Sequence, residues 1–424
     1  MKQLTNPERL QWPAICRRPQ LELDFLDGTV RNILNRVRNS GDAALKELTL
    51  QLDKVALTSL QVSQAELDAA VHQIPAELKT AILTAAKNID VFHRAQQQTF
   101  AKIETMPGVV CWRKATPIQK VGIYIPGGTA PLFSTVLMLA IPARIAGCAE
   151  VILCTPPNPD GQINPAILLA AQLTGVKKIF KVGGAQAIAA LAFGTETIPA
   201  VSKIFGPGNQ YVTKAKQLIS QEGIAIDMPA GPSEVLVIAD GEANPKFVAA
   251  DLLSQAEHGV DSQVVLVTTA PQLVASILTE IDNQLPSLPR QELAREALKN
   301  SLAITFTQAG DLIDFVNEFA PEHLIINTRD CDSLVDQITN AGSIFLGPYT
   351  PEAAGDYASG TNHTLPTNGF AKAYGGVSLE SFVKHITVQQ ISKAGLALLG
   401  PIVETMATAE QLEGHAQAVR VRRS

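Results

Sequence analysis

The feature that most constrains the fold is a regular alternation of short apolar runs and helical patterns that begins near Val121. The runs VGIYI, VILC and KIFKV are apolar at consecutive positions, and a segment with helical spacing follows each of them. Continuous apolar strands separated by helices are typical of a parallel sheet that helices cover on both faces. The alternation resumes after Pro232 with EVLVIAD, QVVLVTT, AITFT, LIINT and SIFLG. The pattern therefore predicts two α/β units.

We expect an α/β fold of two Rossmann-like parallel-sheet domains, one inserted in the other, with an N-terminal arm and a small helical C-terminal segment. The expected regions are an arm over residues 1–22, a first domain over 23–120 plus 234–377, an inserted domain over 121–233, and a helical segment over 378–424.

Local signals add detail at both ends of the chain. Val30, Ile33, Leu34 and Val37 have helical spacing, and Gly41 is well placed to end that helix. Residues 350–377 are rich in Gly, Pro, Asn and Thr, and a long loop of this kind is often functional. We expect this segment to act as a lid over the site.

Composition excludes several classes of protein. The 424 residues are 46% hydrophobic and carry a formal net charge of −6, which favours large buried cores and argues against a nucleic-acid binder. The most apolar stretch is interrupted by Pro142, Arg144 and Glu150, so we expect no membrane span. The five cysteines form no CxxC pair, which favours a reducing cytoplasm and argues against a thiolate zinc site.

Several polar clusters contain histidine. Gln255 and His258 lie three residues apart near the end of an expected helix and share a face, while Asp356 lies in the glycine-rich loop and His415 on the last helix. Imidazole nitrogens with carboxylate or amide oxygens could hold zinc and leave exchangeable positions. A helix C-terminal cap is the alternative for Gln255 and His258, because the spacing is not that of HExxH.

Glu322 and His323 are adjacent and follow Pro321. Neighbouring side chains diverge on a helix or a strand, so the two can share a pocket only at an irregular turn. Together they would offer two bases of different strength. A surface helix end is the alternative interpretation.

Two glycine-containing turns each follow an apolar run and precede a helix: GIYIPGGTAP and FGPGNQYVTKAK. Such turns let backbone amides approach an anionic group at a helix N-terminus. Neither turn matches GxGxxG or GxxxxGK[ST], so a nucleotide could bind here without the usual fingerprint.

Seven longer motifs occur in one order: YIPGGTAPLFSTVLMLAIPARIAGC, KVGGAQAIAALAFGTE, KIFGPGNQYV, DMPAGPSEVLVIAD, DLLSQAEHG, APEHL and GDYASGTNHTLPT. With these motifs the chain resembles the histidinol dehydrogenase family, from about Phe25 to Arg420. Members of that family are zinc enzymes of histidine biosynthesis that oxidise L-histidinol to L-histidine with two NAD and a water, through histidinaldehyde.

The resemblance implies the roles of individual residues. It implies zinc ligands at Gln255, His258, Asp356 and His415, further substrate contacts at Ser233, His323 and Glu410, and NAD contacts at Tyr124, Gln186 and Asn209. It also implies a homodimer whose C-terminal parts complete the partner's sites, with NAD held by the inserted domain. Many members have EGL where this chain has Glu410-Gln411-Leu412, but the glutamate is retained.

The resemblance further implies that zinc positions the substrate while His323 and Glu322 act as bases. An ordinary carboxylate is a weak base at neutral pH, so we expect burial to raise the pKa of Glu322. The alternatives are a related zinc dehydrogenase for another alcohol, a zinc hydrolase that uses Glu322, and a binding module without catalysis.

Overall fold

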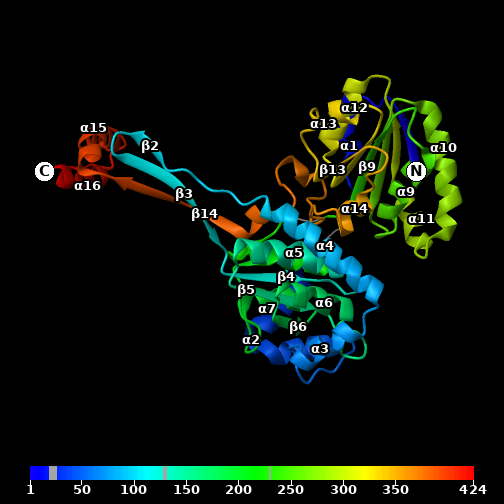
Figure 1. Cartoon of the computed structure of the whole chain (residues 1–424), viewed down its shortest axis with the longest axis horizontal. Helices are drawn as coiled ribbons and strands as arrows, with labels where there is room; N and C mark the ends of the chain where they lie inside the picture. The colour runs from blue at the N-terminus through cyan, green and yellow to red at the C-terminus, as the bar shows by residue number, and fades with distance from the viewer. Residues whose placement is uncertain (19–25, 128–130, 229–230) are drawn as a thin grey trace.

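The computed structural model describes residues 1–18, 26–127, 131–228 and 231–424. These residues form two α/β lobes and a narrow arm that projects from one lobe and ends in two helices at the C-terminus (Figure 1). No described helix combines the length and the apolar character that crossing a bilayer requires.

One lobe is built on a six-stranded sheet in which every neighbouring pair of strands is parallel. The strand order is β1-β11-β10-β9-β12-β13. The strands are β1 (Lys2–Thr5), β9 (Glu234–Ala239), β10 (Gln263–Thr268), β11 (Leu302–Thr305), β12 (His323–Asn327) and β13 (Ser343–Leu346). The helices are η1 (Arg9–Gln11), α1 (Trp12–Ile15), α9 (Pro245–Ala256), α10 (Pro271–Gln284), η3 (Leu285–Ser287), α11 (Gln291–Lys299), α12 (Ala309–Phe319), α13 (Cys331–Val335) and α14 (Glu352–Tyr357).

The beginning of the chain is not an irregular arm. β1 pairs with β11 at the edge of the six-stranded sheet, and Trp12 is buried against Phe306 and Phe315. The expectation was wrong because KQLT has no apolar run, and an exposed edge strand needs none. Residues 19–22 of the expected arm lie outside the described residues.

The other lobe is built on a five-stranded parallel sheet of order β6-β5-β4-β7-β8. The strands are β4 (Lys120–Tyr124), β5 (Glu150–Thr155), β6 (Lys178–Lys181), β7 (Lys203–Phe205) and β8 (Ala225–Ile226). The helices are α2 (Asp27–Leu52), α3 (Gln64–His72), α4 (Ala76–Arg94), α5 (Phe133–Ala146), α6 (Pro165–Thr174), α7 (Gly184–Phe193) and α8 (Gln210–Gln221).

Helices α2, α3 and α4 pack with this five-stranded sheet, not with the six-stranded one that the expected division of 23–120 implied. α2 packs on α7 and α8, α3 packs on α6, and α4 packs on α5. The inserted unit therefore begins at the helices before β4 and separates β1 from the rest of its sheet. Amphipathic helices reveal in sequence that they have a packing face but not which sheet receives it.

Both sheets bury alternate side chains against opposite layers of helices, as the continuous apolar strands predicted. Ile152 and Leu153 of β5 enter different cores, and so do Val235 and Leu236 of β9. The order in which successive strands are added also reverses in both sheets, between β4 and β7 in one and between β9 and β12 in the other. Ligands of open α/β sheets commonly bind at such switch points, outside the carboxyl ends of the strands.

The arm is a three-stranded antiparallel sheet of β2 (Ile103–Met106), β3 (Val109–Pro117) and β14 (Val383–Ile391). Its tip carries α15 (Lys393–Ala409) and α16 (Glu413–Arg423) (Figure 1). η5 (Leu379–Phe382) directly precedes β14, whereas η4 (Phe370–Lys372) lies against the lobe of the six-stranded sheet, where Lys372 pairs with Glu318 of α12. The C-terminal segment is thus not helical throughout. The mostly exposed strand VKHITVQQI gains its partner from β3, nearly 270 residues earlier, which local pattern cannot reveal.

Candidate functional site

The first cluster of predicted residues lies at the amino end of the six-stranded sheet. His323 is the first residue of β12, between Val235 of β9 and Ser343 of β13. Ala320 ends α12 with a φ of 51°, and Pro321 then redirects the chain into the strand. This is the irregular turn that the adjacency of Glu322 and His323 required, and both side chains are buried.

The backbone of Glu234 at the start of β9 holds both residues. Its N–H donates to Glu322 Oε2 at 2.9 Å, and its carbonyl oxygen lies 3.0 Å from His323 Nδ1. A carbonyl can only accept, so Nδ1 carries a proton and donates. His323 Nε2 is buried without a hydrogen-bond partner among the described residues and lies 3.4 Å from Asp356 Oδ1. This nitrogen is therefore the free position of the ring.

The side chain of Glu234 is anchored by Arg18, which the sequence gave no reason to single out. Arg18 Nη2 donates to Glu234 Oε2 at 2.8 Å and to the Phe319 carbonyl at 2.6 Å, and its guanidinium lies 3.6 Å over the Phe319 ring. Both charged side chains are almost completely buried. Asn368 N–H donates to the other carboxylate oxygen. The ion pair thus fixes the start of β9 beneath Glu322 and His323.

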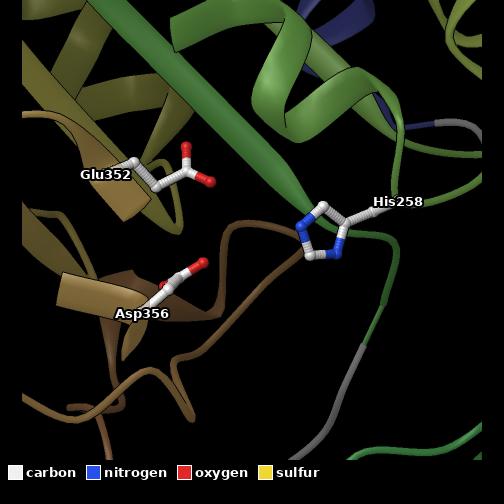
Figure 2. Close-up of side chains that lie close together, drawn as sticks. All are labelled: His258, Glu352 and Asp356. Atoms are coloured by element: carbon white, nitrogen blue, oxygen red, sulfur yellow. The ribbon is translucent and has the colours of Figure 1, made fainter. Parts of the chain in front are cut away.

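A second cluster faces His323 from two other elements. His258 follows α9, and Glu352 and Asp356 lie on α14, four residues apart; the donor atoms of the three lie within 4.8 Å of one another. Figure 2 shows the three side chains pointing toward a common space. The sequence predicted His258 and Asp356 but missed Glu352. Its four-residue spacing from Asp356 would have placed the two carboxylates on one face had α14 been recognised as a helix.

Gln255 borders the same space from the last turn of α9 and is buried. Its amide satisfies both neighbours when its nitrogen donates to Glu352 and its oxygen accepts from Glu234 N–H. With the amide reversed, its oxygen faces the Glu352 carboxylate directly. Two oxygens lie face to face favourably only when a proton or a cation lies between them.

Burial dominates the electrostatics of the cluster. It raises the pKa of Glu322 to about 8 and that of Glu352 to about 8. It also lowers the pKa of His258, which favours the neutral, metal-ligating imidazole. Burial opposes ionisation of Asp356, but the nearby His323, whose Nε2 lies 3.4 Å from Asp356 Oδ1, outweighs burial and holds the pKa of Asp356 low.

The charge on His323 is opposed by burial and favoured by its acidic neighbours. The carboxylates of Glu322, Glu352 and Asp356 outweigh burial and hold the pKa of His323 well above its ordinary value. The buried Glu322 and Glu352, the half-buried Asp356 and the two imidazoles of His258 and His323 therefore border a space that can accommodate a cation. The donors are nitrogen and oxygen atoms without thiolates, and this set fits zinc.

The predicted residues Glu410 and His415 are not brought to this cluster within one chain. Glu410 caps the end of α15, His415 lies on α16, and both are exposed at the tip of the arm, far from α9 and α14 (Figure 1). Gln411 adopts a φ of 60°, a conformation that favours glycine. Ser233 directly precedes Glu234, and its carbonyl accepts from Gln263 N–H.

The segment over residues 350–377 joins the two lobes, which the sequence did not predict. His363 Nδ1 lies 2.8 Å from the Asp356 carbonyl, and its Nε2 lies 3.0 Å from Thr135 Oγ1 on α5. Asn362 donates to the Met138 carbonyl on the same helix at 2.6 Å. α14 is therefore held against the lobe of the five-stranded sheet, and a lid motion of the segment stays a prediction.

Tyr124, Gln186 and Asn209 line one cavity of about 580 Å³ at the carboxyl end of the five-stranded sheet. The Tyr124 hydroxyl accepts from Gly184 N–H at 3.0 Å, and Asn209 caps α8 by accepting from Tyr211 and Val212 N–H. Gln186 Oε1 is buried without a partner among the described residues. The size fits a cofactor site. Residues 128–130 of the first glycine turn lie outside the described residues.

Comparisons with known proteins agree over almost the whole chain. A sequence model of the family described as histidinol dehydrogenase matches residues 16–423. The chain is 59% identical over 422 residues to the histidinol dehydrogenase of Bacteroides fragilis strain YCH46, covering 100% of this chain and 99% of that protein. It is 54% identical over 415 residues to that of Escherichia coli K12, covering 97% and 95%.

A solved structure shows the same fold. The crystal structure of histidinol dehydrogenase from Elizabethkingia anophelis has a TM-score of 0.98 to this chain at 53% sequence identity. The match covers 100% of this chain and 98% of that one.

Proposed function

We propose, from the premise that the chain belongs to the histidinol dehydrogenase family, that it oxidises L-histidinol to L-histidine through L-histidinaldehyde, the last step of histidine biosynthesis. The observation that carries the proposal is the convergence of the buried Glu322 and His323 with the half-buried Asp356 and the exposed His258 at one cluster. We expect the reaction to take place in the cytoplasm, as the cysteine pattern predicted.

The proposed metal is one zinc ion per subunit. Gln255, through its amide oxygen, His258 and Asp356 would hold it, together with His415 of the partner subunit. Glu352 faces the same space and would either bind the metal or orient Gln255. We further propose that these ligands, with Ser233, His323 and Glu410, contact the substrate, whose imidazole and amine are both good zinc donors.

When bound, NAD accepts one hydride in each of two steps, and zinc orients the substrate. With a bound cation offsetting the surrounding carboxylates, His323 Nε2 would be unprotonated and would take the proton of the substrate hydroxyl in the first step, while Nδ1–H stays bonded to the Glu234 carbonyl. Glu322 takes a proton from the water that adds to the aldehyde. After it has released the first proton to solvent, His323 would accept a second proton as the hydrate is oxidised. Tyr124, Gln186 and Asn209 would hold NAD in the 580 Å³ cavity.

A homodimer with shared sites is also part of the proposal. Leu398, Ile402 and Met406 recur every four residues along α15 and are 53%, 51% and 60% exposed. Such an apolar stripe at the tip of an arm favours burial against a second copy of the chain. A partner docked there would bring its own Glu410 and His415 to a cluster that lacks them.

Metal removal tests the proposal. Treatment with a chelator should abolish NADH formation from L-histidinol, and added zinc should restore it. His258→Asn should lose metal affinity by about 10–100-fold or more, because one of few ligands is gone. His72→Asn is the matched control, because His72 ends α3 far from the cluster in sequence and packing. Full activity in the chelated, metal-depleted enzyme would contradict the zinc role.

A further inference from the structure

Asp53 lines the cavity proposed for NAD and is not among the predicted cofactor contacts. It caps the C-terminal end of α2, where its N–H donates to the Thr49 carbonyl at 2.9 Å. Its side chain lines the cavity together with Tyr124, Gln186 and Asn209. The carboxylate therefore faces the same space as the predicted cofactor contacts while belonging to a helix outside the sheet.

The carboxylate of Asp53 is only partly satisfied within the protein. Its Oδ2 atom is buried and makes no hydrogen bond to any described residue, and no described cation contributes to the pKa of the carboxyl. Burial raises the pKa of this carboxyl, and no neighbouring positive charge offsets the effect. Asp53 as a whole is half-buried, and a carboxylate at a cavity wall with an acceptor that has no protein partner is suited to a hydroxyl donor on a ligand.

Asp53 could take the place of an acidic residue that other dinucleotide-binding folds carry after a strand of the sheet and that this sheet does not supply among the described residues lining the cavity. In dinucleotide-binding α/β folds an Asp or Glu beyond the first βα unit bonds the ribose 2′-hydroxyl of NAD. Here β5 is followed by Pro156, Pro157 and Asn158, which line the cavity without a carboxylate. The carboxylate at this cavity comes instead from Asp53, the residue that caps the C-terminal end of α2.

The charges nearby are those expected of a site for NAD and not for NADP. A second hollow of about 370 Å³ shares Thr29, Ile33 and Leu52 with the cavity and is bordered by Arg36. Arg36 Nη2 is engaged by Glu47 Oε2 at 3.3 Å, so its charge is already paired. A 2′-phosphate beside Asp53 would meet a negative charge.

We propose that Asp53 selects NAD over NADP by accepting a hydrogen bond from the 2′-hydroxyl of the adenosine ribose and by repelling a 2′-phosphate. The inference rests on the proposed function, because it assigns the adenosine end of NAD to the cavity that Tyr124, Gln186 and Asn209 line.

Calorimetric Kd values for NAD and NADP test the selection without depending on turnover. Wild-type protein should bind NAD at least about tenfold more tightly than NADP, and Asp53→Asn should reduce that ratio by about tenfold or more. Asp68→Asn is the matched control, since it removes the same charge from the exposed surface of α3 and should leave the ratio unchanged. Asp53→Ser repeats the test with a smaller side chain.

A wild-type comparison of ADP with its 2′-phosphorylated form needs no variant and covers the case in which the variants fold poorly. Equal affinity for the two nucleotides would overturn the inference, and so would an Asp53→Asn ratio indistinguishable from that of Asp68→Asn. Failure of the wild-type protein to bind either dinucleotide would contradict the proposed function itself, and the inference with it.

Discussion

At the scale of single residues, burial and neighbouring charges set the pKa of each proposed base and so the pH range in which it can accept a proton. Glu322 and His323 are neighbours in sequence, but one is held by the N–H and the other by the carbonyl of the same residue, Glu234. The expectation that burial raises the pKa of Glu322 agrees with its value of about 8. Near neutral pH this carboxyl is mostly protonated, so its capacity to act as a base increases as the pH rises through about 8.

Glu322→Gln should separate the two oxidations. The variant should still form the first NADH through His323 but should hydrate the aldehyde about 10²–10⁴-fold more slowly, because an amide cannot accept the proton of water. Wild-type turnover of histidinaldehyde should increase with pH through about 8, and the variant should lose that increase. Stopped-flow NADH absorbance across pH measures both effects.

The control for this variant is Glu318→Gln, which changes an exposed glutamate on α12 that pairs only with Lys372. It should leave both oxidations and their pH dependence unchanged. If Glu322→Gln produces two NADH per histidinol with the wild-type pH profile, Glu322 is not the base that activates water.

At the scale of elements, the sequence predicted the strands that are continuous apolar runs and missed the strands that are polar and pair with distant segments. Most strands of both sheets and the helix around Val30 follow from local pattern, since each buries a recognisable face. β1 and β14 were missed because their exposed side chains carry no pattern and their partners lie hundreds of residues away.

The site was predicted in the same uneven way. His258, Asp356, Glu322 and His323 could be named because the motifs carry them. Arg18 could not be, because its role depends on a buried contact with Glu234, 216 residues later. A role of this kind depends on which residues are neighbours in the folded structure, and local sequence does not reveal that.

Gly206 tests how closely the elements around the NAD cavity fit. It follows β7 with a φ of 121°, and a Cβ there would overlap the carbonyl of Tyr124. Gly206→Ala should displace Tyr124, weaken NAD binding and destabilise the lobe. Gly175→Ala is the control, because Gly175 also has positive φ but has open space around its Cβ position.

We expect the Gly175 variant to lose about 1–2 kcal/mol, from backbone strain alone. The Gly206 variant should lose at least about 1 kcal/mol more, from the overlap. Urea unfolding measures both losses. Equal losses and unchanged NAD affinity would show that the close approach to Tyr124 is unimportant.

At the scale of the whole molecule, the arm explains why one chain has an incomplete cluster. α16 carries His415 at the tip, while α9 and α14 hold the other proposed ligands at the base of the lobes (Figure 1). In the proposed dimer, each tip would complete the partner's cluster and bring the four proposed ligands together.

Mixing two inactive variants tests the shared site. His323→Asn removes the base from the body of its own chain, and His415→Asn removes the ligand that its tip would donate. In an equal mixture of unfolded and refolded chains, half of the dimers are mixed, and each mixed dimer has one intact site. Activity should return to about a quarter of the wild-type value. No recovery, in a mixture shown to contain mixed dimers, would contradict sharing.

The most direct test of the account is the number of NADH molecules formed from each L-histidinol by the purified zinc-loaded protein, followed by absorbance at 340 nm. Two molecules, with L-histidine as the product, are predicted for an enzyme in which His323 serves both oxidations and Glu322 the hydration between them. A single NADH with aldehyde release, or none from histidinol while another alcohol is oxidised, would contradict it.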